Sequence, residues 1–186
     1  MPKDQKAEFS VTESELVFKG KIWNVVRERF DFKGTELARE FVQHTGAVAI
    51  LAMDDEGRIL LLRQYRHPVR EYLWELPAGL LDIEGESRQD AAKRELLEES
   101  GYQANSWNEL TEFYCTPGGN DELITIFLAK DLVHIGFAEE LEGEEADLLV
   151  EWVPFSEALQ SVLKSEMRNP SAVVGIMALA LKQDLK

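Results

Sequence analysis

The chain has 186 residues, 45% of them hydrophobic, so it is long enough to bury the core of one compact domain. Its 20 basic and 35 acidic residues give a net charge of −15, which repels nucleic-acid backbones and anionic membrane surfaces. We therefore expect no nucleic-acid and no membrane partner. A small phosphorylated substrate is still admissible, because bound cations reverse the field inside a cleft.

The single cysteine, Cys115, excludes an internal disulfide, and no Cys or His stands beside it in the sequence to suggest a metal site. Residues 1–10 contain no apolar stretch of signal-peptide length, and the apolar run 172–180 is too short to span a bilayer. These features predict a reducing, cytoplasmic location.

The first part of the chain predicts an N-terminal antiparallel β-meander. Three segments are rich in β-branched and aromatic residues and are separated by Lys-Gly pairs: residues 15–18, 22–32 and 36–43.

The following segments predict a core of buried strands. The run 47–53 is typical of a central strand, residues 54–57 of a hairpin turn, and residues 58–65 of the returning strand. Further strands are predicted at residues 110–114, 123–129 and 148–153. Residues 139–147 predict an acidic loop, and two helices are predicted to begin near Pro154 and Pro170. This order predicts an α/β (α+β) fold with helices packed on mixed sheets.

Between these strands, residues 86–102 have the pattern of a helix. Ser87, followed three residues later by Asp90, resembles a capping box. Ala92 and Leu96 form an apolar stripe, and Gly101 suits the C-terminal stop.

Three carboxylates share one side of this helix, because Glu98 and Glu99 follow Glu95 by three and four residues. Like charges at these spacings destabilise a helix by about 0.2 to 0.5 kcal/mol per pair, so a compensating partner is expected. Oxygen ligands of this kind suit Mg²⁺, for which Mn²⁺ can substitute. The alternative is a solvated acidic face paired with Lys93 and Arg94.

The surrounding residues resemble the Nudix box, G-x5-E-x7-R-E-U-x-E-E-x-G-U, where U is aliphatic or aromatic. Seven residues after Glu86 the chain reads Arg94-Glu95-Leu96-Leu97-Glu98-Glu99-Ser100-Gly101-Tyr102. The one departure lies upstream, where six residues separate Gly79 from Glu86 instead of five. We expect the metal-binding face to survive this insertion and the loop to bulge.

The resemblance implies a Nudix fold, with mixed β-sheets sandwiched between helices, and hydrolysis of a nucleoside diphosphate linkage. It implies Mg²⁺ ligands at Glu95, Glu98 and Glu99, joined by the carbonyl of Ala78, with Arg94 holding one of the carboxylates. Bound cations would neutralise the diphosphate and acidify the attacking water.

Features outside the box favour ADP-ribose as the substrate. Pro117 lies fifteen residues beyond Tyr102, as in ADP-ribose pyrophosphatases, which the chain resembles most. The same resemblance implies substrate contacts at Arg39, Glu40, Arg66, Pro117, Gly118 and Glu122. It also implies that the acidic segment 142–147 supplies the general base, either Glu145, which we favour, or Glu144.

In the resembling enzymes the N-terminal sheet mediates a swapped homodimer. We therefore assign residues 1–45 to an N-terminal β-sheet and dimerisation region and residues 46–186 to a Nudix hydrolase domain.

The expected products are AMP and ribose 5-phosphate. The alternatives are a Nudix enzyme for another nucleoside diphosphate derivative, such as a nucleotide-sugar or a dinucleotide, and a nucleotide sensor without catalysis. A sensor is expected to have damaged metal ligands, whereas all three box carboxylates are present.

Overall fold

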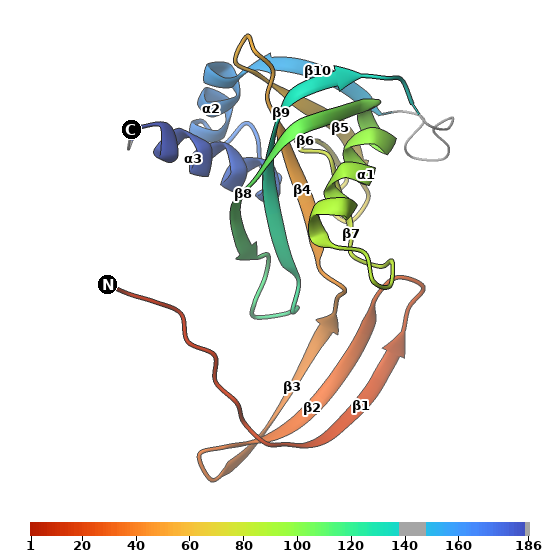
Figure 1. Ribbon diagram of the computed structural model, residues 1–186. Coiled ribbons are helices and arrows are strands. Elements are labelled where there is room, and N and C mark those ends of the chain that lie inside the picture. The colour runs from red at the N-terminus through yellow and green to blue at the C-terminus, as the bar shows by residue number, and fades with distance from the viewer. Residues whose placement is uncertain (138–147, 185–186) are drawn as a thin grey trace. The chain divides into compact units, whose positions relative to one another are not determined.

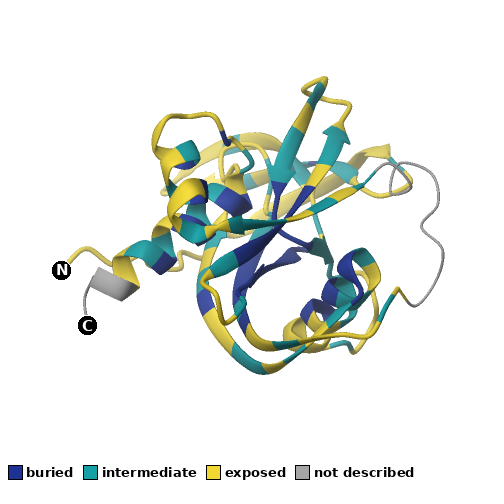
Figure 2. Ribbon diagram, turned by 90° about the horizontal axis from the view of Figure 1, so that it is seen from above, coloured by how far each residue is buried: buried dark blue, intermediate teal, exposed yellow. Residues whose placement is uncertain are grey.

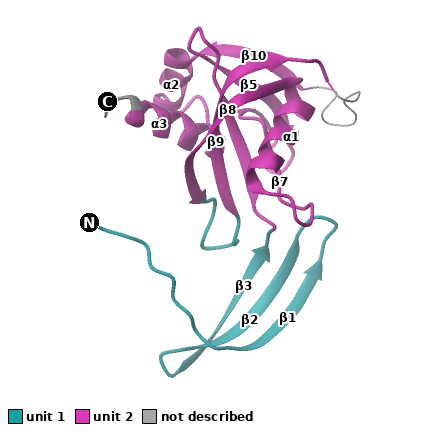
Figure 3. Ribbon diagram, viewed as in Figure 1, with its two compact units in different colours: residues 1–44, 114–122 teal, residues 45–113, 123–186 magenta. Residues whose placement is uncertain are grey.

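The computed structural model describes residues 1–137 and 148–184 of the chain (Figure 1). Buried residues concentrate in the strands at residues 47–52 and 58–66 and on one side of the helix at residues 88–100 (Figure 2). The chain divides into two compact units (Figure 3): unit 1 comprises residues 1–44 and 114–122, and unit 2 comprises residues 45–113 and 123–186. No helix in the described ranges is long and apolar enough to span a membrane.

Unit 1 contains the predicted antiparallel meander. Its three strands are β1 (Val11–Lys19), β2 (Asn24–Phe32) and β3 (Thr35–Gln43), and they pair in chain order. Lys33 and Gly34 both have positive φ, 56° and 87°, which is the backbone that a tight turn between twisted strands requires. Asp31 supports this turn, because its side chain accepts a hydrogen bond from the Gly34 N–H at 2.7 Å.

The described part of unit 2 contains two sheets. The first has the order β7 (Ala78–Leu80), β4 (Ala47–Ala52), β9 (Leu123–His134) and β8 (Tyr102–Tyr114), with β4 antiparallel to β7 and parallel to β9. The second is antiparallel and has the order β10 (Leu149–Pro154), β5 (Arg58–Arg66) and β6 (Glu71–Glu75).

The predicted hairpin at residues 54–57 forms its turn, but the two flanking strands separate at once. The Asp54 N–H donates to the Arg58 carbonyl at 3.0 Å, and the pairing then consists of one bridge between Met53 and Ile59. Strands β4 and β5 continue into different sheets. Every residue of β4 is buried, so that strand needs cover on both faces, which the helices packed on the four-stranded sheet provide.

Within the described residues, three helices cover these sheets: α1 (Arg88–Ser100), α2 (Phe155–Leu163) and α3 (Pro170–Asp184). Helices α1 and α3 both contact β4 and β9, with α1 on one side of this sheet and α3 on the other (Figure 1). The buried residues Ala91, Ala92 and Leu96 turn the apolar side of α1 towards the core. This arrangement confirms the predicted packing of helices on mixed sheets.

Both predicted ends of α1 are confirmed. The Ser87 hydroxyl oxygen accepts a hydrogen bond from the Asp90 N–H at 3.1 Å, and the same hydroxyl donates to the Asp90 carboxylate. Asp90 therefore supports the cap side chain rather than a backbone N–H as in a complete capping box. At the other end, Gly101 has a φ of 72° and its N–H donates to the Leu97 carbonyl at 2.8 Å.

Candidate active site

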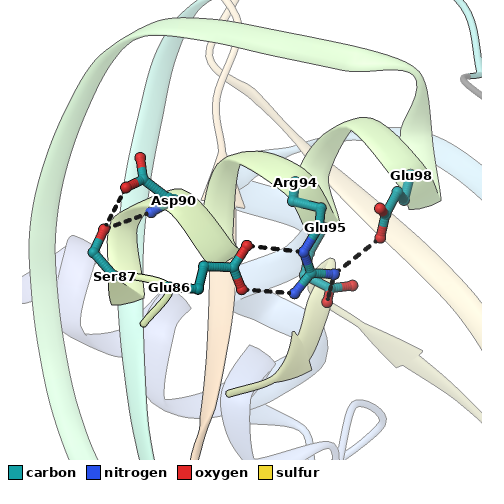
Figure 4. A network of polar contacts seen from close by, with 6 residues as sticks. All are labelled: Glu86, Ser87, Asp90, Arg94, Glu95 and Glu98. Atoms are coloured by element: carbon teal, nitrogen blue, oxygen red, sulfur yellow. Dashed lines mark hydrogen bonds and ion pairs between the residues drawn. The ribbon is translucent and has the colours of Figure 1, made fainter. Parts of the chain in front are cut away.

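Arg94 is the centre of an ion-pair network on α1 (Figure 4). Its Nε and Nη2 donate to the two carboxylate oxygens of Glu86, each at 3.0 Å, in the bidentate geometry that suits a guanidinium. Its Nη1 donates both to Glu95 and, at 3.0 Å, to Glu98. The hydrogen bonds that Arg94 donates to Glu86 contribute most to raising the pKa of Arg94 above its ordinary value. One guanidinium thus compensates the repulsion between the neighbouring carboxylates.

The backbone at the start of the box lies against the carboxylates of α1. The Ala78 N–H donates to Glu99 Oε2 at 2.8 Å. A Cβ added at Gly79 would overlap the carboxylate of Glu95, well inside the 3.0 Å that real Cβ contacts respect. A side chain at position 79 would therefore displace the carboxylate of Glu95 from its place against the backbone. The close approach brings Ala78 and the helix carboxylates together, as the metal-ligand prediction needs.

The inserted residue of the box loop is accommodated away from this contact. The Glu86 N–H donates to the Ile83 carbonyl at 3.2 Å, and Gly85 in the same turn has a φ of 81° with no atom within 4 Å of its added Cβ. The loop that carries the extra residue thus contains an open turn before the helix, while Gly79 packs against Glu95.

Glu95 is a carboxylate in poor contact with solvent, since its side chain is 13% exposed whereas that of Glu98 is 48% exposed. Burial raises the pKa of Glu95, the contact with Arg94 opposes this shift, and the charges of Glu98 and Asp82 add to it. A group in this position gains from a further positive charge, because a cation stabilises its ionised form.

The donor set fits a hard divalent cation. The carboxylates of Glu95, Glu98 and Glu99 and the backbone of Ala78 offer oxygen ligands, and each carboxylate has two oxygens with about four lone-pair sites in total. Within residues 1–137 and 148–184, no three His, Cys, Asp or Glu side chains surround a metal position by themselves. Arg94 draws Glu95 and Glu98 towards itself, so waters and substrate phosphates would complete the coordination, as Mg²⁺ commonly requires.

Arg66, at the end of β5, is held by a carboxylate that the sequence did not reveal as its partner. Its Nε and Nη2 donate to the two oxygens of Glu75 at 2.9 and 2.7 Å. The Glu75 side chain is only 6% exposed, whereas that of Arg66 is 47% exposed. The buried acid thus orients a guanidinium that also reaches solvent. An acid inside the otherwise apolar run Leu73–Leu76 was the signal available in the sequence.

The remaining substrate-contact candidates lie in unit 1. Glu40 on β3 accepts a hydrogen bond from Arg27 Nε at 2.8 Å, and Arg39 donates to the Ala38 carbonyl at 2.8 Å. The other three candidates belong to the segment 114–122: Pro117, Gly118 and Glu122. The base candidates Glu144 and Glu145 lie outside the described residues.

Comparisons with known proteins agree with this geometry. The sequence model of the family described as NUDIX domain matches residues 43–173. An ADP-ribose pyrophosphatase of Mycobacterium tuberculosis is 42% identical over 92% of this chain and 83% of its own length. One from Bacillus subtilis is 37% identical over 92% of each chain. The crystal structure of an ADP compounds hydrolase superposes with a TM-score of 0.75 at 23% identity, covering 98% of this chain and 97% of its own, which confirms the predicted fold.

Proposed function

This chain belongs to the Nudix family, and we infer from that membership that it hydrolyses the diphosphate linkage of ADP-ribose to AMP and ribose 5-phosphate. The observation that carries the reaction type is the contact between the Ala78-Gly79 backbone and the box carboxylates of α1. The substrate is supported by the two ADP-ribose pyrophosphatases that resemble the chain over nearly its whole length.

Nudix hydrolases depend on divalent cations, and we assign Mg²⁺ to this site, with Mn²⁺ as a substitute. Glu95, Glu98, Glu99 and the Ala78 carbonyl would hold it. When bound, the cation neutralises the diphosphate and lowers the pKa of a coordinated water. Arg94 fixes the directions of Glu95 and Glu98 through its hydrogen bonds. Preorganised carboxylates of this kind need little rearrangement when substrate arrives.

Residues outside the box are assigned to binding and positioning the substrate. Arg66, oriented by Glu75, offers a guanidinium of the kind that binds phosphate oxygens. Further contacts are assigned to Arg39, Glu40, Pro117, Gly118 and Glu122. The general base is assigned to Glu145 in preference to Glu144, because Glu145 agrees better with the resembling enzymes.

A product assay tests this function. The purified protein is incubated with ADP-ribose, a nucleotide-sugar or a dinucleotide, with Mg²⁺ or with excess chelator. Wild type is compared with Glu99→Gln and with Glu109→Gln, which removes an exposed carboxylate on β8 as a matched control. We expect AMP and ribose 5-phosphate from wild type and the control, and loss of turnover in Glu99→Gln or with chelator.

The other outcomes separate the alternatives. Preferential turnover of the nucleotide-sugar or the dinucleotide would retain the Nudix reaction and replace the substrate. Tight binding of ADP-ribose without turnover by wild type would favour the sensor. Metal-dependent turnover that Glu99→Gln retains would remove Glu99 from the ligand set.

We also assign a homodimer, formed through unit 1. The apolar residues Leu16, Val26 and Phe41 are directly opposite one another on its three strands, and Leu16 is 52% exposed. Exposed apolar side chains on a sheet are typical of a protein–protein interface. Light scattering on wild type and Leu16→Glu tests this assembly, with a dimer expected only for wild type. A cytoplasmic location stays a prediction from the sequence.

A further inference from the structure

A second group of polar side chains lies within unit 1, where the segment 114–122 meets the end of β3. The Cys115 N–H donates to the Glu122 carbonyl at 3.2 Å, and the Glu122 carboxylate is near enough to the Cys115 thiol to raise the pKa of that thiol. Directly after β3, His44 Nε2 lies 3.5 Å from Glu122 Oε1. One carboxylate therefore faces a thiol and an imidazole. Cys115 has no histidine beside it in the sequence, but in the fold it and His44 both lie next to Glu122.

The burial of this group distinguishes it from a surface ion pair. The His44 side chain is 4% exposed and that of Glu122 is 17% exposed. The Trp23 ring covers the imidazole, with 5.8 Å between the two ring centroids. Removing a polar group from water is costly unless it has a partner, so the contact between His44 and Glu122 contributes to holding both side chains in place.

Backbone hydrogen bonds fix the same segment to β3. The Val42 N–H donates to the Gly119 carbonyl at 2.9 Å, and the His44 N–H donates to Asp121 Oδ1 at 2.7 Å. Between these contacts, the Thr116 carbonyl accepts from the Gly119 N–H at 2.9 Å and so closes the turn that contains Pro117. The side chains of Cys115, Glu122 and His44 therefore lie where the segment that contains this turn begins and ends.

We propose that His44 is a positioning residue for substrate binding, which together with the Cys115 thiol holds the Glu122 carboxylate and the Pro117-Gly118 turn in one orientation. This inference rests on the proposed function, because it takes Glu122 and the turn as contacts of ADP-ribose. An acidic side chain near an anionic substrate must be directed away from the phosphates, because the repulsion between like charges falls as their separation grows. Two fixed neighbours supply that direction.

The thiol acts in this group as a hydrogen-bond donor. Burial raises the pKa of the Cys115 thiol, and the charge of Glu122 and its hydrogen bond raise it further. The protonated form therefore predominates at neutral pH, and the S–H can donate to the carboxylate. A raised pKa leaves little thiolate at neutral pH, so Cys115 reacts slowly with electrophiles until the pH approaches that pKa.

The single cysteine allows a test that does not depend on activity. The rate of alkylation of Cys115 by iodoacetamide is measured against pH, where the midpoint reports the thiol pKa and the plateau reports access. Glu122→Gln should lower the midpoint, because the carboxylate charge is lost. His44→Ala should also lower the midpoint, because the Glu122 carboxylate is no longer held near the thiol. His44→Gln keeps an N–H donor and should restore most of the shift.

Matched controls keep this result decisive. His134→Ala removes an exposed histidine from unit 2 and should leave the midpoint unchanged. Circular dichroism establishes that each variant is folded. A wild-type midpoint in folded His44→Ala would overturn the inference, because His44 would then have no influence on Glu122.

Kinetics with ADP-ribose test the consequence for binding. His44→Ala should raise KM about tenfold, the loss expected for a hydrogen bond to a charged group, with kcat changed less than about twofold. His44→Gln should recover part of the KM, and the double variant with Glu122→Gln should be no worse than Glu122→Gln alone. Equal losses in kcat for both His44 variants would contradict a positioning role. Wild type inactive on ADP-ribose would refute the proposed function, while the alkylation profile would still decide on the side-chain group.

Discussion

Substitution of Gly79 by alanine should separate catalysis from stability. The added Cβ would overlap the carboxylate of Glu95, which must retreat by about 1 Å to reach the 3.0 Å limit. The overlapping atoms are the far end of a flexible side chain, so the fold can yield at little cost. A misplacement of about 1 Å in a catalytic group lowers the rate about 100-fold, which is close to 2.7 kcal/mol in activation free energy.

The assay is the hydrolysis of ADP-ribose under saturating Mg²⁺, with kcat and KM determined separately and the melting temperature measured beside them. We expect kcat to fall about 100-fold while the melting temperature changes by less than about 4 °C. Glu109→Gln is the control, because it changes an exposed side chain on β8 that lies outside the box. Wild-type kcat in Gly79→Ala would refute the reasoning, since Glu95 would then not need its place against the backbone.

Three further substitutions test the charged groups of unit 2. Arg94→Ala leaves the carboxylate of Glu86 without its bidentate partner, so chemical denaturation should give a free energy of unfolding lower by roughly 3 kcal/mol. Because burial raises the pKa of Glu95, its folded-state pKa lies above the unfolded value, and its contribution to stability is lost as the pH rises through the folded pKa. In the presence of chelator, Glu95→Gln should therefore melt at a higher temperature than wild type at pH 7, and the difference should shrink as the pH falls. Arg66→Lys removes the guanidinium that binds both oxygens of Glu75, so the free energy of unfolding measured in urea should fall by about 1 to 3 kcal/mol, and the KM for ADP-ribose should rise.

The features that the sequence predicts well are local. Helix α1 has its cap residue Ser87, its stop Gly101 and its buried Leu96 at spacings that belong to one continuous element, so no distant contact is needed to recognise them. The turn at Lys33-Gly34 follows in the same way from a glycine, which adopts positive φ at little cost. For such elements, the chemistry of a few neighbouring side chains decides the backbone conformation.

The features that the sequence does not predict depend on pairing between distant segments. The hairpin pattern around residues 54–57 does not show that β4 and β5 belong to different sheets, because both strands are apolar and either arrangement buries them. The contact of His44 with the segment 114–122 spans 77 residues between His44 and Asp121. The partnership of Arg66 with Glu75 requires the register of β5 on β6. Each of these contacts exists only after the tertiary fold is known.

The open turn around Gly85 has a consequence for recognising related proteins. On one side of it, Gly79 is fixed by its packing against Glu95, and on the other side α1 is fixed by its cap at Ser87. The two pieces of the motif are anchored independently, so the number of residues that joins them can drift without moving a ligand. A search that demands one loop length would pass over proteins whose ligands are intact, whereas a search that matches the two anchored pieces separately would find them.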